Sequence, residues 1–100
     1  RLQACAHERL RDLDTWLMPT VAVRAPLRAD VQDDTARFFA TNGLVLRNTT
    51  VLNFLDGCAL SIPCQGPGEL PVGLSVGGLH CTDARIFQVG RAIEACLQEA

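Results

Sequence analysis

The sequence predicts an α/β fold in which helices pack on a small mixed, partly antiparallel sheet. Two short apolar runs, Cys58 to Ile62 and Val72 to Val76, have the length and composition of buried strands covered on both faces. The segment between them, Gln65 to Glu69, is rich in glycine and proline and favours an antiparallel hairpin. From Thr82 to Leu97, apolar residues recur at the spacing of one helix face.

The first third of the chain predicts one helix and one strand. Apolar residues recur at helical spacing from Leu2 to Leu13, with charged residues between them, so we expect an amphipathic helix there. Trp16 to Met18 form an apolar run that Pro19 ends, because proline has no N–H to donate to a sheet. Between Val21 and Asp34 there is no periodicity, which indicates a surface loop whose acidic end begins a helix.

Two helices are expected before the hairpin. The first runs from about Asp34 to Thr41 and stops at Asn42-Gly43, a pair that tolerates the left-handed conformation of helix ends. Asn48 or Thr49 caps the second, because either side-chain oxygen can accept a hydrogen bond from a free N–H of the first turn. Gly57 ends this second helix.

The closing helix is capped by Thr82 or Asp83 and needs a sheet to cover. Its apolar stripe, with the residues beside it, comprises Ile86, Val89, Ile93, Leu97, Phe87, Gly90 and Cys96. A chain of 100 residues forms at most one domain, here 1–100. Because 48% of its residues are hydrophobic, the apolar supply exceeds what so small a core needs. Some apolar surface is therefore expected to lie against another polypeptide.

Charge and cysteine content exclude some classes of partner. Nine basic and 11 acidic residues give a net charge of −2, so nothing favours binding to nucleic acid or to an anionic membrane. No apolar stretch approaches the ~18 to 20 residues of a membrane span. Five cysteines at irregular spacing indicate reduced thiols and a cytoplasmic location, with Cys58 and Cys96 at buried positions. The start, Arg1-Leu-Gln3, has neither a methionine nor a signal peptide and suggests a cut from a longer chain.

Several motifs together resemble the C-terminal end of amidase-signature hydrolases. These are Asp14-Thr-Trp-Leu-Met-Pro-Thr20, Asn53-Phe-Leu-Asp-Gly-Cys-Ala59, a strand ending at Pro63, Leu70-Pro-Val-Gly-Leu74, and a last helix that carries a glutamate. The resemblance covers nearly the whole chain. It implies the C-terminal part of the larger amidase-signature α/β sheet fold, and a parent protein that hydrolyses carbon–nitrogen bonds in amides.

The resemblance also implies what the chain lacks. Family members use a serine nucleophile, a second serine in a cis peptide and a lysine, all from a Gly/Ser-rich core upstream of this region. This chain has no lysine, and its only serines, Ser61 and Ser75, lie in apolar runs. We therefore expect no catalytic residue and no activity in the isolated chain. Its expected partners are the missing N-terminal catalytic part, the amide substrate of the intact enzyme and, for the fragment alone, a second copy in a homodimer.

The resemblance further indicates which residues line the substrate pocket and which shape the backbone. The pocket candidates are Thr20, Thr49, Thr50 and Leu52, for each of which ordinary helix packing explains the pattern equally well. The structural motif comprises Pro19, Asn53, Gly57, Pro63, Pro71 and Gly73. No cofactor and no metal are implied.

Other classes of function remain open. The runner-up is a small non-catalytic domain that keeps the amidase scaffold and serves in assembly or binding. A thiol hydrolase would need a histidine base near a cysteine, for which His80 beside Cys81, or across the hairpin from Cys64, is available. A metal site from His7, His80, Cys81 and Asp83 lacks the paired ligand spacing of structural zinc sites, so a polar turn before the last helix is favoured.

Overall fold

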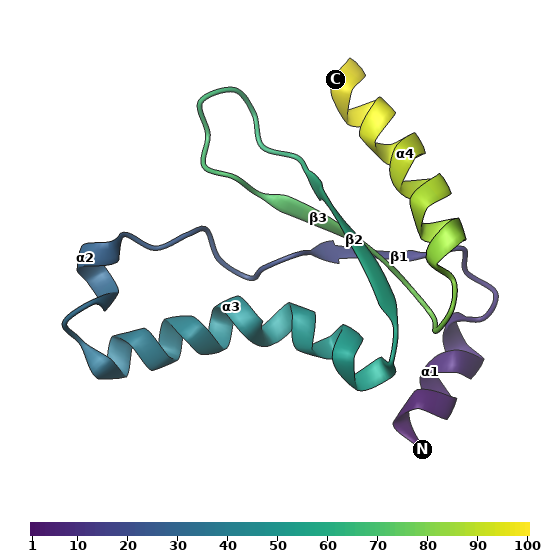
Figure 1. Ribbon diagram of the computed structural model, residues 1–100, viewed down its shortest axis with the longest axis horizontal. Helices are drawn as coiled ribbons and strands as arrows, with labels where there is room; N and C mark the ends of the chain where they lie inside the picture. The colour runs from purple at the N-terminus through teal and green to yellow at the C-terminus, as the bar shows by residue number, and fades with distance from the viewer.

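The computed structural model describes all residues from Arg1 to Ala100 (Figure 1). Its elements in chain order are α1 (Leu2–Leu10), β1 (Trp16–Pro19), α2 (Arg28–Val31), α3 (Thr35–Leu55), β2 (Cys58–Pro63), β3 (Gly73–Gly78) and α4 (Asp83–Glu99). The α/β class is therefore confirmed. No helix of the chain is both long enough and apolar enough to cross a lipid bilayer.

The three strands form one sheet in the order β1-β3-β2. The expected hairpin is confirmed, since β2 and β3 pair antiparallel with Cys58 opposite Gly78 and Pro63 opposite Gly73. The strand β1 also pairs antiparallel with β3, on its other side. The prediction of a mixed sheet is wrong for these residues, because every pairing in the sheet is antiparallel.

The helix α4 covers one face of the sheet and makes the core. The buried apolar residues are Ile62, Val76 and Ile86, with Cys58, Leu60, Val89 and Ile93 packed against them. Gly90 is buried where α4 crosses Leu60, and a Cβ there would overlap the Leu60 side chain. The predicted stripe is thus correct for Ile86, Val89 and Ile93. Leu97, Phe87 and Cys96 lie at exposed positions of α4.

The break predicted at Asn42-Gly43 is wrong, because α3 continues through it as one helix of 21 residues. A glycine costs a helix only about 1 kcal/mol relative to alanine, which a long helix tolerates. Asn48 and Thr49 do not cap a separate helix. The Asn48 amide donates to the Pro19 carbonyl oxygen at 2.8 Å, and the Thr49 hydroxyl donates to a carbonyl within α3.

Both ends of α3 are capped. At its start Asp34 accepts a hydrogen bond from the Arg37 backbone N–H at 2.9 Å, as the acidic end of the preceding loop predicts. At its end Asp56, and not Gly57, takes the left-handed conformation with φ of 53°. Gly57 is required for another reason, since a Cβ there would lie 2.6 Å from the Gly78 backbone oxygen.

The first third of the chain differs from the prediction in two places. The first helix ends at Leu10, before Leu13, and buries no residue, so its expected apolar face is not covered within this chain. The segment 21–34, expected to be a loop, contains the one-turn helix α2. Four residues with no side-chain cap are too short for a periodicity to be detected.

The molecule is a thin, open layer rather than a closed core. Its principal extents are 46 × 40 × 16 Å, and only 7 of 100 residues are buried. The accessible surface of 7443 Å² exceeds by roughly 1,900 Å² the ~5,500 Å² expected of a folded monomer of this mass. The expectation that both strands are covered on both faces is wrong for β2, whose residues alternate between covered and exposed positions. It is confirmed for β3, where Ser75 and Val76, on opposite faces, are both buried.

Because the core is small, a single substitution in it can test which residues form the core. Val76 is 0% exposed, so Val76→Ala removes fully buried methyl groups and should lower the free energy of unfolding by roughly 2 kcal/mol. Leu17 pairs with Val76 across the sheet but is 54% exposed. Leu17→Ala therefore serves as the control and should change the free energy of unfolding far less. Urea denaturation followed by circular dichroism measures both. Equal losses in the two variants would contradict the assigned core.

Candidate functional site

Polar side chains gather on the sheet face opposite α4. Because side chains alternate along a strand, Ser61 and Ser75, which pair across β2 and β3, point to the face opposite Leu60 and Val76. On this face Trp16 of β1 lies over Gly77, where a Cβ would come within 2.6 Å of the indole ring. Ser75 is only 3% exposed, so a hydroxyl is buried at the centre of the sheet.

Three hydroxyl groups form one hydrogen-bonded cluster, which we call the hydroxyl cluster: Thr20, Ser61 and Ser75. The Thr20 Oγ1 atom lies 2.6 Å from Ser61 Oγ and 3.0 Å from Ser75 Oγ. Thr20 is held in place because its backbone N–H donates to the Gly73 carbonyl oxygen at 2.9 Å. A Cβ at Gly73 would lie 2.5 Å from Ser61 Oγ and 2.7 Å from Thr20 Oγ1, so glycine is needed for the cluster to close.

The hydroxyl cluster borders a shallow cavity of about 280 Å³. Its lining residues are Thr20, Val21, Ser61, Pro63, Gln65, Pro71, Val72 and Gly73. The Gln65 Oε1 atom accepts a hydrogen bond from the Val72 backbone N–H at 3.2 Å, which fixes the side-chain amide beside the cavity. The lining combines hydroxyl, amide and apolar groups and contains no charged side chain.

Of the four pocket candidates, only Thr20 lines this cavity. The hydroxyls of Thr49 and Thr50 both donate to the Leu46 carbonyl oxygen, at 3.1 and 2.7 Å, one turn back along α3. A Leu52 methyl group lies beside Gly57 at the end of α3. The structure therefore does not bring the four together in one cavity of this chain.

The residues of the structural motif form the backbone around these side chains. The Pro19 carbonyl oxygen ties β1 to α3 through Asn48, and the Asn53 carbonyl oxygen accepts the Asp56 N–H at 3.3 Å. Pro63 ends β2, while Pro71 and Gly73 line the cavity. Sequence reasoning missed Ser61 and Ser75 as site residues. Their opposition in the expected hairpin is the signal that could have identified them.

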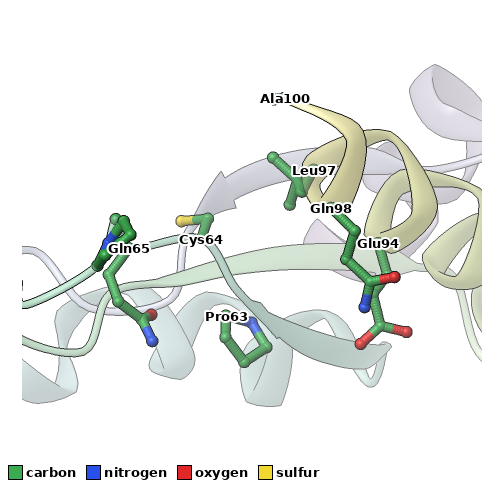
Figure 2. A pocket seen from close by; sticks show the side chains of 9 residues that line it. Pro63, Cys64, Gln65, Glu94, Leu97, Gln98 and Ala100 are labelled. Carbon is green, nitrogen blue, oxygen red and sulfur yellow. The ribbon is translucent and has the colours of Figure 1, made fainter.

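A larger depression, of about 520 Å³, lies between the loop after β2 and the end of α4. Figure 2 shows Cys64 and Gln65 on the loop and Glu94, Leu97 and Gln98 on the helix. General acid–base catalysis requires a partner within hydrogen-bond distance, and the Glu94 carboxylate has no hydrogen bond or ion pair in the chain. This depression therefore has no catalytic pair.

A thiol active site needs a histidine base beside a cysteine. His80 Nδ1 lies 3.1 Å from Asp56 Oδ2, and no hydrogen bond joins a histidine to a cysteine. The Cys58 thiol lies 3.4 Å from both the Leu79 carbonyl oxygen and Thr82 Oγ1. No group of three or more His, Cys, Asp or Glu side chains is arranged to hold a metal ion.

The five thiols differ in exposure, and this difference can be measured. Cys58 is half-buried, whereas Cys5, Cys64, Cys81 and Cys96 are exposed, so the expected burial of Cys96 is wrong for this chain alone. We expect Ellman's reagent to titrate four thiols rapidly in the native chain and the fifth only after denaturant is added. Cys58→Ser is the control that should remove the slow phase. Five fast thiols in the native chain would contradict the position of Cys58.

Comparison with known proteins gives several relatives that match most of the chain. It is 34% identical to 2-amino-5-chloromuconic acid deaminase of Comamonas testosteroni, over 96% of the chain and 21% of the deaminase. It is 32% identical to a Rhodococcus erythropolis protein described as an uncharacterized protein in the nthA 5′ region, over 92% of the chain and 46% of that protein. It is 29% identical to a glutamyl-tRNA(Gln) amidotransferase subunit of Saccharolobus solfataricus, over 87% of the chain and 17% of that relative.

The chain thus spans about a fifth of the deaminase and about half of the Rhodococcus protein. No family profile and no solved structure matches it. The deaminase and the amidotransferase subunits, at 27 to 34% identity over most of the chain, are amidase-family proteins. The chain therefore corresponds to a fragment of a protein of the amidase-signature family.

Proposed function

We propose that this chain is the C-terminal structural and pocket-wall part of an amidase that hydrolyses carbon–nitrogen bonds in amides. The observation that carries the proposal is the uncovered helix α3. Over 21 residues it contains only two charged side chains, Arg37 and Arg47, and it buries no residue. The apolar side chains are spread around α3 and not confined to one face, a pattern that favours a position within a larger protein.

The exposed apolar side chains of α3 support the proposal that the rest of the enzyme packs against this helix. Phe39, Leu46 and Phe54 are 65%, 51% and 66% exposed along α3. Figure 1 shows α3 on the opposite side of the strands from α4, with its length free of any other helix except α1 and α2 at its ends. The chain spans 21% of the deaminase. An amidase of that length would have about four residues outside this segment for each residue within it, and these could cover the surface.

In the intact enzyme the missing N-terminal part supplies the chemistry. Its serine attacks the amide carbonyl carbon, the second serine and the lysine relay the proton to the leaving amine, and water then releases the acyl group. This chain contributes the sheet and its covering helices, and one wall of the substrate pocket at Thr20. Five free cysteines support a cytoplasmic location for the enzyme.

Without that N-terminal part, the same surface is available to a second copy of the chain. The roughly 1,900 Å² of excess surface per chain is within the range that stable protein interfaces bury. A two-fold arrangement would place α3 of one copy against α3 of the other. We therefore propose a homodimer for the isolated fragment.

A non-catalytic assembly or binding domain is the second candidate. It is favoured by the absence of lysine and by a hydroxyl cluster that has no basic group beside it. In this case the apolar surface of α3 would bind another protein permanently, and no catalytic core would precede it in the same polypeptide.

Expression of the entire reading frame that encodes this chain separates the two candidates. We expect a longer protein that releases ammonia from benzamide or isobutyramide, with activity lost when the serine of its Gly/Ser-rich segment is replaced by alanine. The 100-residue chain is the matched control. A reading frame that starts directly before Arg1, or a longer protein with no amide hydrolysis on a broad panel, would favour the assembly domain.

A further inference from the structure

We propose that the buried residue Ser75 is a positioning residue for the pocket wall. Together with Ser61 it fixes the rotamer of Thr20, so that Thr20 turns its methyl group, and not its hydroxyl, toward the substrate. The inference rests on the proposed function and deepens it, because it assigns to this wall a residue that no substrate can touch. It is carried by the burial of Ser75 and by the direction in which the Thr20 hydroxyl points.

Ser75 lies in the central strand β3, where an apolar β-branched residue would pack better than a serine. It is 3% exposed, and a buried hydroxyl without a hydrogen-bond partner is destabilising. Its hydroxyl bonds only to Thr20 Oγ1, at 3.0 Å, and no buried side-chain oxygen or nitrogen of the chain is left unpaired. The contact with Thr20 is therefore what makes a serine tolerable at this position.

The Thr20 side chain reaches from β1 across β3 toward β2. Its backbone N–H donates to the carbonyl oxygen of Gly73, a residue with no side chain. A Cβ at Gly73 would lie 2.7 Å from Thr20 Oγ1 and 3.1 Å from Thr20 Cβ, so the threonine occupies the space above this glycine. From there Oγ1 bonds to Ser61 on β2 and to Ser75 on β3. Two hydrogen bonds from two strands thus fix the direction of this hydroxyl.

Other rotamers of Thr20 would break these bonds. Rotation about χ1 to another staggered position moves Oγ1 away from both serines. The buried Ser75 hydroxyl would then have no partner, which disfavours such a rotamer by about 5- to 150-fold. One rotamer is therefore expected to predominate. In that rotamer the methyl group, which shares Cβ with Oγ1, points away from the serines.

The methyl group of Thr20 extends an apolar surface. Thr20 lines the cavity together with Val21, Pro63, Pro71 and Val72, whose side chains are all apolar. With its hydroxyl turned to the serines, Thr20 adds a methyl group to this surface and offers no hydrogen bond to the substrate. We therefore expect this wall to pack against an apolar part of the substrate and to select it by size.

Three-bond couplings from the Thr20 methyl carbon to its backbone nitrogen and carbonyl carbon measure the rotamer in the ¹³C,¹⁵N-labelled chain. We expect the values of one staggered rotamer in the unchanged chain and averaged values when Ser61→Ala and Ser75→Ala are combined, a pair called the serine double variant below. Thr49 and Thr50, whose hydroxyls bond within α3, are internal controls and should not change. Averaged Thr20 couplings in the unchanged chain, or one unchanged rotamer in the serine double variant, would overturn the inference.

Ser75→Cys provides a second substitution at the buried position, for the case in which Ser75→Ala does not fold. Cysteine is close to serine in size, but its thiol is a weak hydrogen-bond donor. Combined with Ser61→Ala it should therefore also give averaged Thr20 couplings. Circular dichroism confirms that each variant is folded before its couplings are measured.

In the longer protein the effect is expected in KM for isobutyramide. A side chain divided among three staggered rotamers presents its methyl group correctly for about a third of the time, so the serine double variant should raise KM about threefold. The value of kcat should change little, because the methyl contact is made equally in the bound state and in the transition state. Thr82→Val is the control, since it removes a part-buried hydroxyl that does not line the cavity. It should lower stability and leave KM unchanged.

A double-mutant cycle separates positioning from a purely structural role. In a Thr20→Val background there is no hydroxyl to orient, so replacing both serines should change KM no further. A structural role alone would raise KM equally in both backgrounds. That result, or an unchanged KM in the serine double variant, would overturn this inference alone. A longer protein without amide hydrolysis would overturn the proposed function, and the couplings of Thr20 would still decide whether the serines fix its rotamer.

Discussion

The 100-residue chain is expected to release no ammonia from benzamide or isobutyramide, even in overnight incubations at micromolar concentration. A hydroxyl nucleophile needs a base within hydrogen-bond distance to remove its proton. The hydroxyls of Thr20, Ser61 and Ser75 are bonded only to one another, and the chain has no lysine. Neither histidine forms a hydrogen bond with any of the three, and His80 Nδ1 lies 3.1 Å from Asp56 Oδ2.

A sensitive glutamate dehydrogenase assay for ammonia measures this, with heat-denatured chain as the background. The Ser61→Ala variant is the matched control, since it should give the same background rate as the unchanged chain. Turnover that survives a second affinity purification and disappears in Ser61→Ala would show that the hydroxyl cluster is catalytic and that the proposed division of labour is wrong.

The isolated chain is also expected to sediment as a dimer of about 21.6 kDa, twice its mass of 10.8 kDa, at tens of micromolar. The driving force is burial of the apolar surface of α3, where Phe39, Leu46 and Phe54 are exposed. Leu46→Glu combined with Phe54→Glu places two carboxylates in that interface and should give a monomer, because a buried unpaired charge costs several kcal/mol.

The control for this experiment is Arg37→Glu, which changes the charge of the same helix at an exposed position that is already polar. It should leave the dimer intact. Sedimentation equilibrium distinguishes the species. A wild-type monomer that binds no hydrophobic dye would contradict both the dimer and the view that α3 needs a cover.

The sheet was largely predictable because its signals are local. Two apolar runs separated by a glycine- and proline-rich turn specify a hairpin, and the strands begin and end within two residues of the expected positions. What the local signals could not give was the number of covered faces. A strand that a larger protein covers on both sides has the same composition whether or not that protein is present.

The helix α3 was harder to predict, since Asn42-Gly43 is a strong stop signal by local rules. Tertiary contacts decide against it: Asn48 is used to tie α3 to the Pro19 carbonyl oxygen of β1, a partner 29 residues away. The hydroxyl bonds of Thr49 and Thr50 to Leu46 likewise satisfy these side chains inside a helix rather than at its cap. The partner of Asn48, 29 residues away, is not visible in a window of ten residues.

The candidate site was predictable only in part. The resemblance to the amidase-signature family pointed to Thr20, whereas Ser61 and Ser75 lie in apolar runs where a single serine looks incidental. The cluster arises from the register of three strands, because Pro19 lies opposite Leu74 and Ser61 opposite Ser75. A shift of one residue in either pairing would send the hydroxyls to opposite faces.

The position of β3 between β1 and β2 also sets the order in which the molecule can be assembled during synthesis. Pro19 pairs with Leu74, which leaves the ribosome 55 residues later. The strand β1 therefore has no strand to pair with while all of α3 is synthesised. Protein synthesis adds about 5 to 20 residues per second, and the delay therefore lasts several seconds. During that interval the apolar α3 and an unpaired strand are both exposed on the nascent chain. This segment is thus where we expect a chaperone to bind.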